Sequence, residues 1–141
     1  MAVRKAKAVW EGNLLSGNGI VEVESGLFKG SYSFMSRFEE GKGTNPEELL
    51  GAAHAACYSM ALSSLLEKNG FKTVKISTQA SVYIEKINES FSITKIILNT
   101  LGEVRGIDEK AFIGFAAEAK VNCPVSKALA STNIELIATL A

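Results

Sequence analysis

The sequence has few of the residues that most often build a metal site or a disulfide scaffold. Among its 141 residues are only two cysteines, two prolines, one tryptophan and one histidine. A single histidine with two widely separated cysteines matches no recurring metal-ligand spacing. The glycines form no nucleotide-binding pattern. We therefore expect neither a metal ion nor a cofactor.

Charge of either sign is balanced as well. The chain has 15 basic and 15 acidic residues and no long run of either, whereas a nucleic-acid or anionic-membrane surface is normally basic. The first 12 residues contain no apolar segment typical of a signal peptide. These features predict a soluble, cytoplasmic protein. In that reducing compartment two cysteines would pair only transiently.

The stretch from Thr44 to Asn69 predicts one long central helix. Asn45 is a suitable N-cap, and Glu48 three residues later would complete a capping box. Residues 49–66 carry no charge, so we expect this helix to be buried on nearly every side. Its serines and few large apolar residues make a membrane-spanning segment a poor interpretation.

The remaining elements follow from alternation and turn residues. In residues 74–85 the even-numbered side chains are expected on the buried face. Asp108 is expected to cap a helix over 109–121, and Pro124 to open a short helix through 129 or 130. The order βββ-α-ββ-α-α-β predicts an α+β fold in one domain, residues 1–141. Strands are predicted at residues 3–10, 20–24, 31–37, 74–85, 91–104 and 134–140.

The two cysteines are the candidate reactive groups. Cys123 precedes Pro124 at a predicted helix start, where the helix dipole favours a thiolate. Burial would raise the pKa of Cys57 unless a cation compensates. Arg37, predicted at the end of a strand, is the candidate cation, and its guanidinium could hold an anion or a peroxide oxygen. From the residues alone, two inert core thiols remain the simpler interpretation.

His54 lies three residues before Cys57, so the two side chains fall on neighbouring faces of the predicted helix. A cysteine–histidine nucleophile pair or a zinc site is one interpretation. A packing or interface role is the other, and we favour it because the chain has one histidine and no metal motif.

Three segments resemble the OsmC (osmotically inducible protein C) family of thiol-dependent peroxidases. They are SRFEEGKG (Ser36–Gly43), GTNPEELLGAAHAACYSMAL (Gly43–Leu62) and NCPVSKAL (Asn122–Leu129). They are more similar to OsmC proper than to the organic-hydroperoxide-resistance branch, and the element order fits over essentially the whole chain. The resemblance implies an OsmC-like fold and an intertwined homodimer with active sites at the subunit interface.

By position, the resemblance implies that Cys57 is the peroxidatic cysteine and Cys123 the resolving cysteine. Arg37 would activate the thiolate, and Glu47 would orient that arginine. The resemblance also implies that the protein is an oxidoreductase with an antioxidant role in the stress response. Organic hydroperoxides, and hydrogen peroxide less well, would be reduced to alcohols through a Cys57 sulfenic acid and a Cys57–Cys123 disulfide. A dithiol, such as that of a lipoylated protein, would restore the thiols.

Helix geometry bears on the dimer independently. Glu47 and Cys57 are ten residues apart, about 15 Å along one helix, which is too far for direct cooperation. If both serve one site through Arg37, the carboxylate comes most simply from the other subunit.

Two other functions stay open: a small-molecule-binding protein with an interfacial apolar cleft, and a thiol hydrolase using Cys57 with His54.

Overall fold

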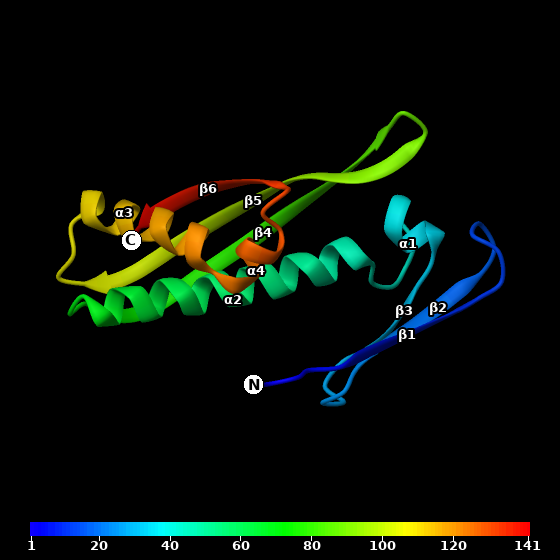
Figure 1. Cartoon of the computed structure of the whole chain (residues 1–141), viewed down its shortest axis with the longest axis horizontal. Coiled ribbons are helices and arrows are strands. Elements are labelled where there is room, and N and C mark those ends of the chain that lie inside the picture. The colour runs from blue at the N-terminus through cyan, green and yellow to red at the C-terminus, as the bar shows by residue number, and fades with distance from the viewer. The chain divides into compact units, whose positions relative to one another are not determined.

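The computed structural model describes all 141 residues and contains six strands and four helices (Figure 1). The chain forms two compact units, residues 1–49 and 50–141. The observed order, βββ-α-α-ββ-α-α-β, confirms the predicted α+β class and adds one helix that the sequence did not predict.

The first unit is built on an antiparallel meander. Its strands are β1 (Ala6–Glu11), β2 (Asn18–Val23) and β3 (Lys29–Tyr32), in that order across the sheet. Trp10 and Tyr32 lie on either side of Gly19, with their ring centroids 5.5 Å apart. A Cβ atom at Gly19 would come within 2.5 Å of the Tyr32 ring, so this close approach of the aromatic ring requires glycine.

The strand predicted for residues 31–37 is wrong beyond Tyr32. The chain turns at Ser33 into a short helix, α1 (Phe34–Phe38). The Ser33 hydroxyl accepts from the Ser36 backbone N–H at 3.1 Å, and the Ser36 hydroxyl accepts from the Ser33 N–H at 2.8 Å. This capping box has serine where glutamate or glutamine is usual, and it overrides the alternating pattern. Arg37 therefore lies in the last turn of a helix.

The long helix α2 (Pro46–Lys68) confirms the central prediction. The Asn45 side chain accepts from the Glu48 backbone N–H at 2.7 Å, as expected of an N-cap. The Glu48 carboxylate does not complete the predicted box, because it accepts from the Thr44 hydroxyl at 2.9 Å instead. Beyond the C-terminus Gly70 has a φ of +86°, a left-handed conformation that ends the helix.

The second unit contains a three-stranded sheet in the order β4-β5-β6. Strands β4 (Lys72–Ile87) and β5 (Ser90–Arg105) form one long antiparallel hairpin, and β6 (Asn133–Leu140) runs parallel to β5. The hairpin turns at Asn88 and Glu89, which both have positive φ values (49° and 68°). Two such residues are typical of the hairpin turns that match the twist of the strands.

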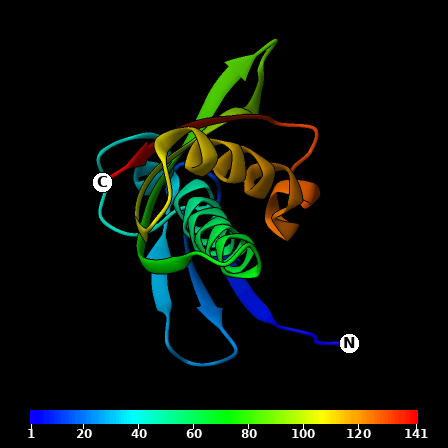
Figure 2. The same cartoon turned by 90° about the vertical axis from the view of Figure 1, so that its left-hand side faces the viewer.

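Helices α2 and α3 (Glu109–Asn122) lie side by side on one face of this sheet (Figure 2). A Cβ atom at Gly102 would come within 2.3 Å of the buried Phe112 ring, so helix and strand pack closely there. The short helix α4 (Pro124–Ala128) follows at Pro124 as predicted. The fully buried core consists of Tyr58, Leu62, Leu66, Ile96, Leu98, Phe112, Ala116, Ala119 and Cys123.

The predicted buried face of β4 is wrong at Val74. A register shift between Thr73 and Lys75 removes Val74 from this face and leaves it 49% exposed. From Ile76 to Val82 the even-numbered residues alternate inward as predicted.

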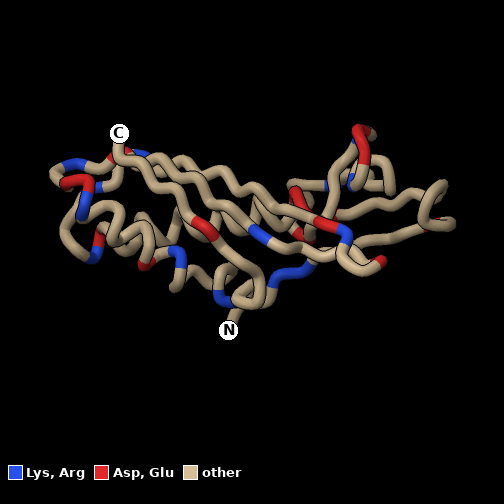
Figure 3. The backbone as a smooth tube through the Cα atoms, turned by 90° about the horizontal axis from the view of Figure 1, so that it is seen from above, with Lys and Arg blue, Asp and Glu red and all other residues tan.

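Helix α2 differs from the expectation of burial on nearly every side. Tyr58, Leu62 and Leu66 are fully buried, but small residues and Met60, which is 75% exposed, form an exposed stripe on its other side. It is the one helix long and apolar enough to cross a membrane by length and composition. Its buried side forms part of the core of the second unit. In each unit acidic and basic residues are interspersed along the backbone (Figure 3).

Candidate active site

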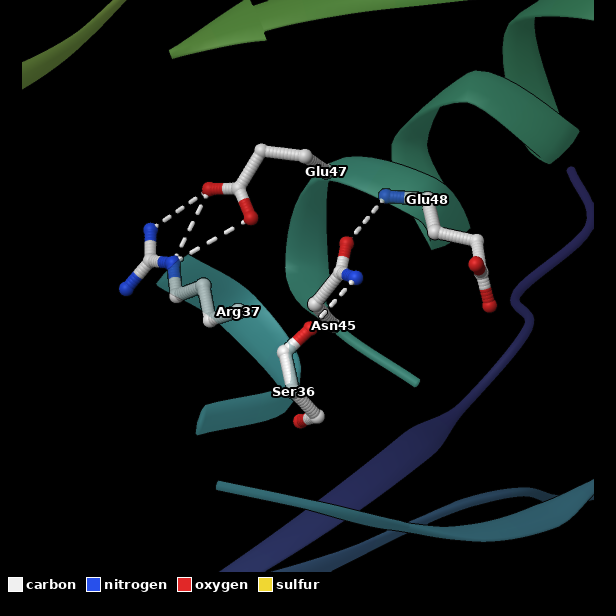
Figure 4. Close-up of polar contacts among 5 residues, drawn as sticks. All are labelled: Ser36, Arg37, Asn45, Glu47 and Glu48. Carbon is white, nitrogen blue, oxygen red and sulfur yellow. Dashed lines mark hydrogen bonds and ion pairs between the residues drawn. The ribbon is translucent and has the colours of Figure 1, made fainter. Parts of the chain in front are cut away.

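The first unit contains a bidentate ion pair between Arg37 of α1 and Glu47 in the first turn of α2 (Figure 4). Arg37 Nε donates to both carboxylate oxygens, at 3.0 and 3.2 Å, and Nη2 donates to Oε1 at 2.7 Å. The Glu47 side chain is 8% exposed and that of Arg37 36% exposed. This arrangement fixes the plane of the guanidinium and leaves Nη1 free for another acceptor.

Hydrogen bonds between α1 and the start of α2 hold the ion pair in place. The Asn45 amide donates to the Ser36 carbonyl at 3.0 Å (Figure 4). The Ser36 hydroxyl donates to the Thr44 carbonyl at 2.7 Å. Asn45 thus caps α2 and also ties it to the helix that carries Arg37. The local sequence therefore positions Arg37 for Glu47 through backbone contacts.

A mainly apolar hollow of about 250 Å³ lies beside Arg37 in the same unit. The Arg37 guanidinium stands over the Phe38 ring, 5.1 Å from its centroid, in a cation–π contact. The hollow is lined by Trp10, Leu14, Tyr32, Ser33, Phe34, Arg37, Phe38 and Pro46. A hollow of this kind suits an alkyl or aryl group whose polar end meets the guanidinium.

The second unit brings the two cysteines together. Cys57 of α2 is half-buried, and Cys123, between α3 and α4, is fully buried. Both are free thiols, and they lie close enough for each to affect the pKa of the other.

The two thiols differ in acidity. Burial raises the pKa of Cys57, and the neighbouring Cys123 raises it further. The backbone N–H of Val125 acts in the opposite direction, but the net shift is upward. Burial also acts to raise the pKa of Cys123, but hydrogen bonds outweigh it and the net shift is downward. These come from the Ser126 N–H, the Cys57 thiol, the Ser126 hydroxyl and the Val125 N–H. Within this unit Cys123 is therefore the more acidic thiol.

His54 is fully buried and does not stand free to act as a base. Its Nε2 lies 2.8 Å from the Ser126 hydroxyl oxygen, and its Nδ1 has no hydrogen-bond partner. Burial lowers the pKa of His54, so the ring is neutral at pH 7. Sequence reasoning missed Ser126. Ser126 is the third residue after Cys123, and a side chain at the third position of a helix can reach back toward the residue that caps it. This spacing is the signal that could have identified Ser126.

The structure thus assembles the four predicted site residues as two pairs. Arg37 binds Glu47 in the first unit, and Cys57 meets Cys123 in the second. No group of three or more His, Cys, Asp or Glu side chains is placed to hold a metal ion.

A family model described as "OsmC-like protein" matches residues 39–137. The chain belongs to the OsmC family. It is 50% identical over 127 residues to the "Peroxiredoxin OsmC" of Escherichia coli K12, covering 89% of each chain. It is 32% identical over 102 residues to the "Organic hydroperoxide resistance protein" of Xanthomonas axonopodis pv. citri, covering 72% of this chain and 69% of that one.

Solved OsmC-family structures have the same fold. The organic hydroperoxide resistance protein OsmC of Legionella pneumophila superposes with a TM-score of 0.70 at 24% identity, covering 100% of this chain and 99% of that one. The matched segment of the family model includes Glu47, Cys57 and Cys123 but begins after Arg37. The assignment of Arg37 to the site therefore depends on its observed ion pair with Glu47.

Proposed function

We propose that this OsmC-family chain is a thiol-dependent peroxidase that reduces organic hydroperoxides, and hydrogen peroxide less well, to alcohols. The observation that carries the proposal is the proximity of two free thiols, Cys57 and Cys123, one half-buried and the other fully buried. The names of the two relatives, a peroxiredoxin and an organic hydroperoxide resistance protein, support it.

In the proposed reaction the Cys57 thiolate attacks the outer oxygen of the hydroperoxide. An S–O bond forms, the O–O bond breaks, and the alkoxide takes a proton to leave as the alcohol. The Cys123 thiolate then attacks the sulfur of the resulting sulfenic acid. The S–S bond forms, and hydroxide leaves with a proton as water. A dithiol restores both thiols by exchange, and we propose a lipoylated protein of the cytoplasm as its carrier.

Cys57 is the proposed peroxidatic cysteine because it is the more accessible sulfur, although its pKa is the higher of the two. It therefore needs a cation to become a thiolate at neutral pH. We assign that role to Arg37, whose Nη1 is free while Glu47 holds the rest of the guanidinium. The same nitrogen would bind the peroxide oxygen that becomes negative as the O–O bond breaks.

We further propose that the chain works as one OsmC-like domain in an intertwined homodimer. Glu47 and Cys57 are separated by about 15 Å along α2, so the Arg37–Glu47 pair of one subunit would serve the Cys57 of the other. The exposed stripe of small residues on α2 offers a surface on which two copies could pack closely.

The apolar hollow beside Arg37 supports an organic substrate. Hydrogen peroxide would gain nothing from aromatic walls, whereas an alkyl or aryl hydroperoxide would bury its tail there. The hydrolase alternative is weaker, because the Nε2 atom of His54 is engaged by Ser126.

The deciding experiment is thiol titration after one equivalent of cumene hydroperoxide. The proposal predicts the loss of two thiols per peroxide within a turnover, release of the alcohol, and full recovery with a dithiol. Slow, non-stoichiometric thiol loss would instead indicate a binding protein with incidental cysteines. Ester turnover without peroxide would indicate a hydrolase.

A further inference from the structure

His54 and Ser126 form a buried polar pair that the peroxide chemistry does not use. They come from different helices, α2 and α4, with exposed fractions of 0% and 5%. Polar groups are costly to bury unless they are hydrogen-bonded, and each is bonded to the other at 2.8 Å. An apolar side chain would fill the same space at less cost. The pair therefore calls for a function, and the second contact of Ser126 suggests one.

Ser126 also lies beside a sulfur atom. It stands in the first turn of α4, three residues after Cys123, and its hydroxyl and backbone N–H both act to lower the pKa of that thiol. The hydroxyl that bonds to the imidazole of His54 is therefore also placed near the Cys123 sulfur. A hydroxyl has one hydrogen to donate. It can donate that hydrogen to Cys123 only if the imidazole donates to the hydroxyl.

The unpartnered ring nitrogen of His54 fixes this direction. Nδ1 is buried without a partner, and a buried N–H with no acceptor is rarer than a buried lone pair with no donor. The hydrogen of the neutral ring is therefore assigned to Nε2, where the Ser126 oxygen accepts it. The Ser126 hydrogen is then free to point at Cys123, which gives a relay of Nε2–H to Oγ–H to Sγ.

We propose that His54 and Ser126 are positioning residues that hold the Cys123 sulfur as the leaving thiolate when an external dithiol reduces the Cys57–Cys123 disulfide. This inference rests on the proposed function for the existence of that disulfide. It adds which sulfur the reductant attacks and what makes the other sulfur leave.

The burial of the two sulfurs sets the point of attack. Cys123 is 0% exposed and Cys57 is half-buried, so the reductant thiolate reaches Cys57. A bond forms between the reductant sulfur and Cys57, the S–S bond breaks, and its electron pair goes to Cys123. The second thiolate of the dithiol then attacks the reductant sulfur and releases Cys57. The dithiol is oxidised to a disulfide, and its two protons pass to solvent or to the cysteines.

A sulfur whose thiolate is stabilised leaves faster in such exchange. The pKa of Cys123 is lowered although burial acts to raise it, and the Ser126 hydroxyl is among the causes. The titratable groups that face Cys123 are Cys57, Tyr58 and His54, all from α2. Among the nearby lysines, Lys120 of α3 donates to a backbone carbonyl and Lys127 of α4 is exposed.

The first test measures Cys123 itself and needs no peroxide. In the Cys57→Ala chain Cys123 is the only cysteine left, so its pKa can be followed by the ¹³Cβ chemical shift against pH. Adding Ser126→Ala should lower the thiolate fraction at neutral pH roughly tenfold, since a hydrogen bond to a charged group is lost. Ser126→Thr keeps the hydroxyl and should restore the fraction. An unchanged pKa in Ser126→Ala would overturn the relay.

A matched control removes a half-buried hydroxyl elsewhere in the same unit. Ser59 binds the Ala55 carbonyl and the Thr78 hydroxyl, both at 2.8 Å. Ser59→Ala should therefore leave the pKa of Cys123 as it is. For His54, Gln keeps a donor close to the Nε2 position and Phe does not, so His54→Gln should raise the pKa of Cys123 less than His54→Phe. Equal effects, or a ¹⁵N spectrum showing Nδ1–H, would contradict the assigned direction.

The second test maps the attacked sulfur in the otherwise unaltered chain. The disulfide is made with diamide, so the test stands even if hydroperoxides fail to produce it. Brief exposure to a monothiol and acid quenching should leave the adduct on Cys57, as peptide mass spectrometry would show. Ser126→Ala should slow adduct formation roughly tenfold without moving it. An adduct on Cys123 would overturn the inference, whereas failure of hydroperoxide to form the disulfide would overturn only the proposed function.

Discussion

The Tyr58 hydroxyl donates to the Ala116 carbonyl at 3.0 Å, and this bond ties α2 to α3 beneath the sheet. Both residues are fully buried. Burial, with the neighbouring Cys123 as a second cause, raises the pKa of the Tyr58 phenol above its usual value. The phenol therefore stays protonated in the folded chain at alkaline pH, where the unfolded chain already ionises.

Replacing Tyr58 by Phe removes that bond while keeping the ring. We expect a loss of about 1 kcal/mol in the free energy of unfolding at pH 7. The raised pKa gives a second signature. The phenol's contribution is constant below the unfolded pKa of about 10 and falls as the pH rises above it, because only the unfolded chain releases the proton. Urea unfolding at pH 7 and pH 10.5 should show a smaller difference between wild type and Tyr58→Phe at the higher pH.

The close contact between Gly102 and Phe112 supports a second stability prediction. A methyl group at position 102 would come within 2.3 Å of the Phe112 ring, which is fully buried. We expect Gly102→Ala to destabilise the chain by about 1–3 kcal/mol through overpacking. Gly114 is the matched control, because its added Cβ would meet nothing within 4 Å on the exposed side of α3. Gly114→Ala should stabilise by about 0.5–1 kcal/mol; a loss in both variants would contradict the packing argument.

The sequence was sufficient for the elements whose causes are local. The N-cap at Asn45 and the short helix that begins at Pro124 confirm predictions made from neighbouring residues. The helix at Phe34–Phe38 was missed because residues 31–37 alternate like a strand, while the deciding bonds are two serine contacts at Ser33. Such local side-chain to backbone hydrogen bonds compete with a strand, and they leave the alternating pattern of the sequence unchanged.

In the candidate site, too, some features could be predicted from the sequence and others could not. The resemblance pointed to Arg37 and Glu47, and the structure supplies the three hydrogen bonds that join them. The partner of His54 could not be predicted, because Ser126 lies 72 residues away along the chain and only the packing of α4 brings it close. The bulge beside Val74 likewise depends on strand pairing, which no period of the sequence records.

The ion pair between Arg37 and Glu47 allows the charge of the arginine to be tested separately from its hydrogen-bond geometry. Lysine keeps the charge but cannot reproduce the bidentate contact or present a second nitrogen in the same plane. We expect Arg37→Lys to lower kcat/KM for cumene hydroperoxide roughly 10–100-fold, the loss of one or two charge-assisted hydrogen bonds. Arg4→Lys, at an exposed position outside the pair, is the control and should have wild-type kinetics. Equal activity in the two variants would remove Arg37 from the reaction.

The proposed resolving role of Cys123 can be tested by mass. In Cys123→Ser the sulfenic acid on Cys57 has no thiol to condense with, so excess hydroperoxide should carry it to the sulfinic and sulfonic acids. Intact-mass spectrometry should show two or three added oxygens in the variant and only the loss of two hydrogens in the wild type. A variant that stays at the sulfenic acid would mean that Cys123 does not protect Cys57.

The last prediction concerns the proposed sharing of sites between two subunits. A mixed dimer would combine one subunit carrying Glu47→Ala with one carrying Cys57→Ser. If the Arg37–Glu47 pair of each subunit serves the Cys57 of the other, one site keeps both groups and the other loses both. The mixed dimer should then have about half of the wild-type activity, by the symmetry of a two-fold interface. If each subunit holds a complete site of its own, both sites are damaged, and the mixed dimer should be as inactive as the two parent homodimers. The decisive comparison is the rate of the purified mixed dimer against those parents, measured with differently tagged subunits before they can exchange.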